Sequence, residues 1–150
     1  MREVNGMFQN TITVFNYHEE TGLWYASVIS GADLIASKSS SHSTEGTNNA
    51  DTVDILINCS AEKVFSTHAG EKGYLPPKEY KKCGDPANSI TFTPERDFIY
   101  AGEWQDLTPV DDDEYDEGFY HALNEKYDGI YMINSVAFYG LLPHFEIGGR

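Results

Sequence analysis

The sequence predicts a mainly β fold, a β-barrel or barrel-like sheet of about six or seven strands with one peripheral helix and long loops. Two observations indicate this class. The 150 residues include 10 Tyr and 8 Phe, which favour the pleated surface of a sheet. Several segments also alternate apolar and polar side chains with the period of two that is typical of strands. A chain of this length is expected to form a single domain over residues 1–150.

The alternation is clearest in residues 52–58, whose sequence is TVDILIN. It places Val53, Ile55 and Ile57 on one face of a strand. Residues 11–17 and 23–29 predict a hairpin across a short polar loop. Residues 89–93 and 97–103 are expected to form two short strands or one bent strand, and further strands are expected at residues 130–139 and 144–147.

Two long segments between the expected strands are predicted to be irregular. Residues 37–49 contain no aliphatic side chain to bury, so ordering them would cost uncompensated entropy, and we expect a mobile loop. Residues 59–88 are punctuated by Gly and Pro, which predicts an excursion without long regular elements. Within this excursion, residues 77–80 are the place for a short helical turn, because Pro is favoured at a helix start.

One helix is predicted over residues 111–127. Apolar side chains recur there every four residues, which is the spacing of one helical face. The acidic residues at its start complement the positive end of the helix dipole, and Lys126 lies in the last turn. Asp128 and Gly129 form a typical stop signal. The recurring apolar residues are Tyr115, Phe119, Leu123 and Tyr127.

The charge excludes several classes of partner. Asp and Glu number 24 against 10 Lys and Arg, which leaves a net charge of −14. Such a surface repels phosphate backbones, so specific binding to DNA or RNA is not expected. The first residues lack a secretory signal, and no apolar run of about 18 residues follows, so we expect no membrane association. Cys59 and Cys83 lack a paired motif and are expected to be free thiols.

The sequence lacks the common motifs for catalysis and cofactor binding. The sequence has no GxSxG, GxGxxG or Walker motif, and its five His residues lack metal-ligand spacing. The acidic run at 111–117 lacks the alternating ligands of a calcium loop. A pair of catalytic carboxylates stays open as an alternative, because the separation of such a pair depends on the fold. We therefore predict a non-enzymatic protein with no catalytic residue, no cofactor and no metal.

The segments carry a resemblance that is distributed over the chain. They are TITVFNY (11–17), WYASVISGADL (24–34), ADTVDILI (50–57), PPKEY (76–80), TPERDFIYAGE (93–103), EKYDGIYMINSV (125–136) and LLPHFEIGGR (141–150). In this order they resemble a family of small head-tail connector proteins of tailed phages that infect Gram-positive bacteria.

The resemblance implies a virion structural protein of the neck with a head-completion or head-closure role. Such a subunit would form a homo-oligomeric ring, expected to be a dodecamer, between the portal or adaptor proteins and the tail proteins. DNA would pass through an acidic channel without specific binding. The protein would lie in the host cytoplasm before assembly and in the virion neck afterwards. The alternatives are a tail-terminator or tail-completion ring and, from another class, a small ligand-binding β-barrel.

Two groups of residues are candidates for assembly. The first lies in the expected mobile loop, which could project into the ring lumen or over a neighbour and become ordered there, or could be a tolerated hairpin insertion. The second lies in irregular segments, where aromatic side chains either anchor subunit contacts or fill the core. The loop candidates are Ser39, Ser40, Ser41, His42, Ser43, Thr44 and Glu45, and the interface candidates are Tyr74, Leu75, Pro76 and Trp104.

Overall fold

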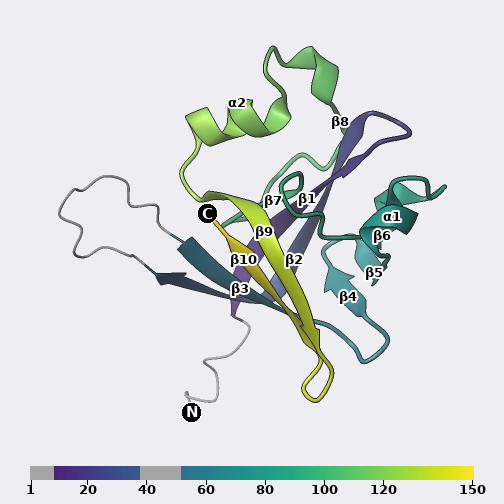
Figure 1. Ribbon diagram of the computed structural model, residues 1–150, viewed down its shortest axis with the longest axis vertical. Coiled ribbons are helices and arrows are strands. Elements are labelled where there is room, and N and C mark those ends of the chain that lie inside the picture. Colours follow the sequence, from purple (N-terminus) through teal and green to yellow (C-terminus); the bar gives the residue numbers. More distant parts are fainter. Residues whose placement is uncertain (1–8, 38–51) are drawn as a thin grey trace.

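The computed structural model describes residues 9–37 and 52–150 and is mainly β, with two short α-helices. Six antiparallel strands close into a barrel (Figure 1), because β2 pairs with both β3 and β1. In barrel order they are β1 (Asn10–His18), β7 (Phe98–Tyr100), β9 (Ile130–Tyr139), β10 (His144–Gly149), β3 (Thr52–Asn58) and β2 (Leu23–Ser37). One further strand, β8 (Val110–Asp111), pairs with the start of β2. The predicted fold class is confirmed.

The strongest strand predictions match the structure. Strands β3 and β9 have the predicted bounds, and β1 and β2 form the predicted hairpin. Strand β2 is longer than predicted, since it continues to Ser37. The expected strand over 97–103 is limited to β7, because Ala101 and Gly102 leave the ladder in a turn. Apart from Ser37, the expected mobile loop over 37–49 lies outside the described residues.

The prediction for residues 59–88 was wrong only in part, because the segment has no long regular element but does contain short strands. Strands β4 (Val64–Thr67) and β5 (Gly70–Tyr74) form an antiparallel pair, and β6 (Ser89–Ile90) adds to β5 in parallel. Gly70 makes the turn between β4 and β5 with a φ of 110°, so this residue shapes a hairpin. The short helical turn is confirmed as α1 (Pro77–Tyr80), and a 3₁₀ turn, η2 (Pro86–Asn88), follows.

The helix predicted over 111–127 is also shorter than expected. Only α2 (Phe119–Lys126) is helical, while residues 112–114 form a 3₁₀ turn, η3 (Asp112–Glu114). Gly118 separates the two with a φ of 93°, which breaks the helical path. The Asp112 carboxylate folds back and accepts hydrogen bonds from the Phe119 backbone N–H at 2.9 Å and from Trp24 Nε1 at 2.8 Å. The acidic run therefore caps α2 without being part of it.

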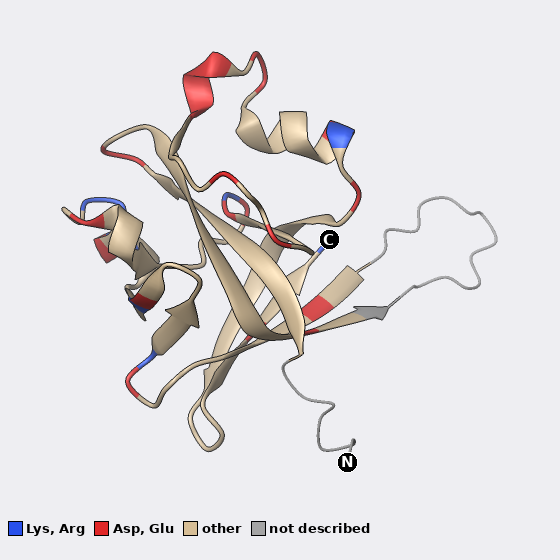
Figure 2. Cartoon of the chain, turned by 180° about the vertical axis from the view of Figure 1, so that it is seen from behind, with Lys and Arg blue, Asp and Glu red and all other residues tan. Residues whose placement is uncertain are grey.

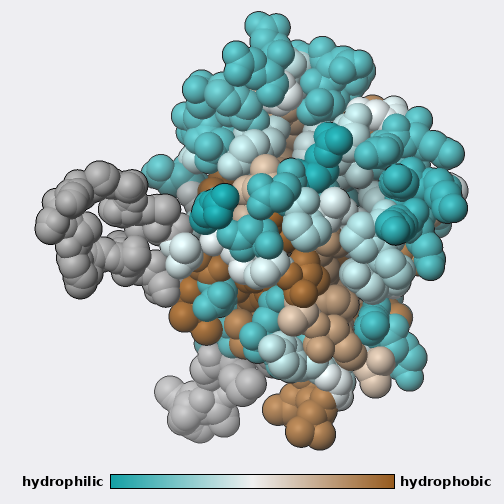
Figure 3. Space-filling view, in the orientation of Figure 1, coloured by the Kyte–Doolittle hydropathy of each residue, from teal (hydrophilic) through white to brown (hydrophobic). Residues whose placement is uncertain are grey.

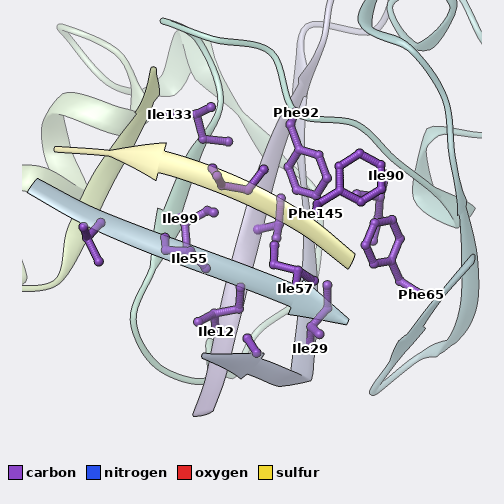
Figure 4. Close-up of a cluster of buried hydrophobic side chains, with 14 residues drawn as sticks. Ile12, Ile29, Ile55, Ile57, Phe65, Ile90, Phe92, Ile99, Ile133 and Phe145 are labelled. Atoms are coloured by element: carbon purple, nitrogen blue, oxygen red, sulfur yellow. The ribbon is translucent and has the colours of Figure 1, made fainter. Parts of the chain in front are cut away.

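The barrel interior is filled by inward-facing side chains (Figure 4). Aliphatic residues dominate, because alternate positions of each strand face inward. The small sheet adds aromatic residues at one end, where the Phe65 ring centroid lies 5.5 Å from that of Phe145. The buried residues of this core are Ile12, Val14, Ile29, Ala32, Val53, Ile55, Ile57, Phe65, Ile90, Phe92, Ile99, Ile133, Phe145 and Ile147.

A second core lies outside the barrel, between its wall and α2. We call it the outer aromatic cluster. Phe15 and Phe98 stack there with centroids 4.7 Å apart, and Phe119 of α2 meets Phe15 edge-on at 5.5 Å. Strand β1 therefore has both faces covered. The buried members of the cluster are Phe15, Trp24, Phe98, Phe119, Leu123 and Ile130, with Tyr100, Trp104 and Tyr127 among those half-buried at its edge.

Candidate functional site

Three of the four predicted interface residues lie together beside the small sheet. Tyr74 ends β5 and is half-buried, with its ring centroid 4.8 Å from that of Phe145. The Leu75 N–H donates to the Ile90 carbonyl at 2.9 Å, so the backbone is held at the sheet edge. Pro76 is exposed. Tyr74 thus packs against the barrel interior, and Pro76 presents the most open surface of the three.

Trp104, the fourth predicted interface residue, belongs to a different part of the molecule. It is half-buried in the outer aromatic cluster, where its ring lies 5.5 Å from Phe15 and 6.4 Å from Phe119. The structure therefore does not bring Trp104 together with Tyr74. The loop candidates, residues 39–45, lie outside the described residues.

A surface that the sequence interpretation did not single out is the turn between β9 and β10, residues 140–143. Leu141 is 94% exposed and Leu142 is 69% exposed. The turn forms a separate hydrophobic projection at the lower end of the molecule (Figure 3). Tight turns usually carry Gly, Asn, Asp or Ser, so two adjacent leucines between Gly140 and Pro143 are an unusual choice. We call this feature the apolar turn.

The strand ends hold the apolar turn in place. The rings of Tyr139 and His144 stack across the hairpin with centroids 5.3 Å apart. His144 Nδ1 donates to the Leu142 carbonyl at 2.6 Å, and Nε2 lies 3.1 Å from Glu146 Oε2. The Leu142 carbonyl raises the pKa of His144, and Glu146 adds to this effect. The two leucines therefore lie on a turn that is held in place by the hydrogen bonds of His144.

The opposite end of the molecule is acidic. Residues 111–117 have the sequence DDDEYDE, which we call the acidic segment. Figure 2 shows its carboxylate-bearing ribbon around η3, at the far end from the apolar turn. Asp113, Glu114, Asp116 and Glu117 are exposed. The structure therefore separates a hydrophobic end from a negatively charged end.

Buried polar groups line one end of the barrel interior. Asp97 is fully buried and accepts hydrogen bonds from Asn16 Nδ2, from the Tyr17 N–H and from the Thr93 N–H, each at 3.0 Å. Burial nevertheless raises the pKa of Asp97 to about 7, against the lowering effect of these donors. This network joins β1 to the segment before β7.

A Lys and Ser pair is also buried. Lys72 Nζ lies 2.8 Å from Ser27 Oγ, and burial lowers the pKa of Lys72. Such a pair can act as nucleophile and base in an enzyme. Here Ser27 is only 2% exposed and Lys72 only 5%, so a substrate cannot reach the hydroxyl without opening the fold. The pair serves to satisfy a buried ammonium group.

A polar cleft lies between the barrel and the small sheet. It has a volume of about 500 Å³ and is lined mainly by polar side chains, with Ser60, Glu62, Ser66 and Glu71 among them. Within residues 9–37 and 52–150, no three His, Cys, Asp or Glu side chains gather to hold a metal ion. No helix in that part of the chain is long and apolar enough to cross a membrane. Cys59 and Cys83 are free, half-buried thiols.

Comparison with known proteins gives one result. The model of a protein family matches residues 7–150. No curated protein and no solved structure matches the chain. Since the match covers nearly the whole sequence, the chain belongs to DUF6751, a family of unknown function.

Proposed function

We propose that this protein is a subunit of a homo-oligomeric ring in the neck of a tailed phage, where it completes the head between the portal or adaptor and the tail. The observation that carries the proposal is the apolar turn, which projects two exposed leucines from a molecule of net charge −14. The segment order that resembles phage connector proteins supplies the biological setting. The subunit is a scaffold with two chemically different ends.

The apolar turn is suited to a contact between copies. Burying an exposed Leu side chain contributes about 1.5–3 kcal/mol, and closed symmetry repeats that gain at every interface of a ring. The turn is narrow and projects from the barrel, so it can enter a recess on a neighbour (Figure 3). His144 and Glu146 hold it in one geometry, which reduces the entropy that association would cost. The exposed leucines therefore mark the surface that assembly covers.

The acidic segment suits the channel. Like charges that face each other across an interface oppose association, so this end should face solvent or the lumen. Twelve copies with a net charge of −14 would place roughly 170 negative charges on the ring. A channel surrounded by such charge repels the DNA phosphates, which lets DNA slide without sticking.

The packed barrel interior favours a structural subunit over a barrel that binds a ligand inside. Ile and Phe side chains fill the barrel, so a ligand the size of a drug would have to displace core residues to enter it. DNA would pass through the hole between barrels, not through any one of them. The alternative function, a small ligand-binding β-barrel, agrees with the observed fold. The filled interior, however, gives no support for a ligand site inside the barrel.

Complementation of a phage that lacks this gene tests the proposal. We expect the double variant Leu141→Asp and Leu142→Asp to fold normally, because both side chains are exposed, and to give DNA-filled heads that do not join tails. Ile35→Ser is the matched control, since Ile35 is also exposed but lies on β2. Particle counts by electron microscopy, together with circular dichroism of the purified variants, provide the readout.

The outcomes separate the alternatives. Unjoined heads and tails with the double variant, and normal particles with Ile35→Ser, would support the neck ring. Tails of irregular length would instead point to a tail-terminator ring. Normal infectious particles from the double variant would reject the role of the apolar turn.

A further inference from the structure

Three aromatic rings line a small surface cavity at the edge of the outer aromatic cluster. The centroids of Tyr100 and Trp104 lie 5.8 Å apart, and those of Trp104 and Tyr127 lie 5.5 Å apart. Both pairs meet nearly at right angles, at 86° and 79°. The cavity has a volume of about 270 Å³, and Glu103 and Asp106 also line it. Perpendicular aromatic walls with a carboxylate rim form an aromatic cage.

Buried contacts hold the walls of the cage. Thr13, which is fully buried on β1, donates to the Gly102 carbonyl at 2.8 Å and accepts from the Trp104 N–H at 3.0 Å. A Cβ on Gly102 would lie 2.9 Å from the Tyr100 ring, so this glycine lets the ring sit against the backbone. The Ala101 N–H donates to the Gly129 carbonyl at 2.8 Å, which ties this loop to the segment after Tyr127. The cage is therefore built before any ligand arrives.

Two aromatic rings elsewhere in this protein each have a cation of the same chain over their face. Lys63 Nζ lies 4.7 Å from the centroid of Phe138, and the Arg96 guanidinium lies 4.5 Å from that of Tyr17. At the cage, Lys126 Nζ lies 5.5 Å from the centroid of Tyr127 but is not among the residues that line the cavity. Within residues 9–37 and 52–150, no Lys or Arg covers the ring of Tyr100 or Trp104.

The rim adds negative charge where a cation would enter. Glu103 is about half exposed, and its carboxylate lies 3.6 Å from His68 Nδ1. The Thr108 N–H donates to Asp106 Oδ1 at 3.0 Å, and hydrogen bonds from Thr108 lower the pKa of Asp106. Both carboxylates therefore lie at the mouth of an aromatic cavity, and the rest of the molecule is strongly acidic. This field favours positively charged ligands.

We propose that the cage formed by Tyr100, Trp104 and Tyr127, with Glu103 and Asp106 at its rim, binds an organic cation. The ligand class is an alkylammonium or guanidinium group, which aromatic faces attract. The volume fits such a head group with a short stem, and it is below the range of drug-sized sites. The cation can belong to a small molecule or to a Lys or Arg side chain of a protein. This site is separate from the apolar turn, so it does not depend on the ring assembly.

Nuclear magnetic resonance of the two indole N–H groups tests the proposal. Choline is the cationic probe, and 3,3-dimethyl-1-butanol is its neutral isostere. We expect choline to shift the Trp104 indole signal at concentrations at least tenfold lower than the neutral isostere does. The Trp24 indole, which donates to Asp112, serves as the internal control and should not shift. Equal responses to the two probes would overturn the proposal.

Two variants test the roles of rings and charge. Tyr127→Leu removes one wall and should weaken choline binding at least tenfold. The exposed pair Glu103→Gln and Asp106→Asn should weaken it at least threefold. The control pair Glu114→Gln and Asp116→Asn removes the same charge from the acidic segment and should leave binding within a factor of two. Unchanged affinity in Tyr127→Leu and in the rim pair, with each protein folded, would contradict the cage.

The source of the cation is a separate arm of the experiment. A short neutral peptide with a central Arg or Lys is titrated in parallel with choline. Tighter binding of the peptide would assign the cage to a side chain of a protein partner, and tighter binding of choline would assign it to a small molecule. Failure of both to shift Trp104 would reject the site.

Discussion

The barrel interior and the outer aromatic cluster are built on the same strands but differ in chemistry and in access to solvent. On β1, Ile12 and Val14 face the interior, whereas Phe15 and Tyr17 face outward toward α2. The interior is mainly aliphatic and sealed, while the outer cluster continues to the surface through Trp104. The interior can therefore provide stability without recognition. The outer cluster can provide both stability and recognition, because an aromatic ring can pack against the core with one face and leave the other face open to a ligand.

The location of the candidate sites follows from this difference. The apolar turn, the acidic segment and the aromatic cage all lie outside the barrel interior. A filled barrel fixes their relative positions, and rigid elements position binding groups more accurately than loops alone. We expect changes inside the barrel to alter stability and changes on its outside to alter recognition.

The largest expected effect is the loss of a ring inside the barrel. Phe145→Ala should lower the free energy of unfolding by about 3–5 kcal/mol, because a fully buried ring leaves a cavity. Trp104→Ala should cost less, since Trp104 is half-buried. Urea unfolding followed by circular dichroism measures both. A greater loss for Trp104→Ala would mean that the outer cluster carries the main stability.

The next effect concerns the buried ammonium group of Lys72. Ser27→Ala removes its hydroxyl acceptor and should lower the free energy of unfolding by about 1–3 kcal/mol. Lys72→Met is the matched variant, because it replaces the ammonium with an apolar group of similar length and should cost less. Thermal and urea unfolding give the comparison. A larger loss for Lys72→Met would show that the ammonium itself stabilises the interior.

The last prediction concerns a slope, the pH dependence of stability that arises from Asp97, which is small over any single pH unit. Because its pKa is about 7 in the folded protein and lower in the unfolded chain, the folded state binds the proton more strongly. Its contribution to stability should be full below about pH 4 and should fall by at most about 1.4 kcal/mol per pH unit up to pH 7. Asp97→Asn removes this titration.

Urea unfolding of both proteins between pH 4.5 and 7.5 tests the prediction. The difference in unfolding free energy, wild type minus Asp97→Asn, should decrease as the pH rises. A difference that stays constant or increases would show that the hydrogen bonds from Asn16, Tyr17 and Thr93 dominate over burial.

Apolar periodicity in the sequence predicted the strands and helices that depend on residues close together in the chain. The strand over 52–58 follows from strict alternation of Val53, Ile55 and Ile57 with polar or less buried residues. The helix over 111–127 was overextended, because the four-residue spacing from Tyr115 to Phe119 continues across Gly118, whose conformation interrupts the helix. Periodicity indicates which face is apolar, but the backbone angles decide where the element begins.

The candidate sites depend on contacts that a local pattern does not contain. The cage joins Tyr100 and Trp104 to Tyr127, which is distant in sequence, through the fold of β7, β9 and α2. Trp104 and Tyr74 were both predicted as interface residues, and the fold places them against different cores. The apolar turn did have a local signal, since Leu141 and Leu142 occupy a turn between Gly140 and Pro143. An apolar pair at a turn can therefore be recognised from the sequence alone.

Cryo-electron microscopy of virions that encode this protein tests the neck assignment most directly. We expect a ring of these barrels between the portal or adaptor and the tail, with the apolar turn against a neighbouring copy and the acidic segment toward the DNA channel. Density for this chain elsewhere in the virion, or virions that lack it, would contradict the proposed function.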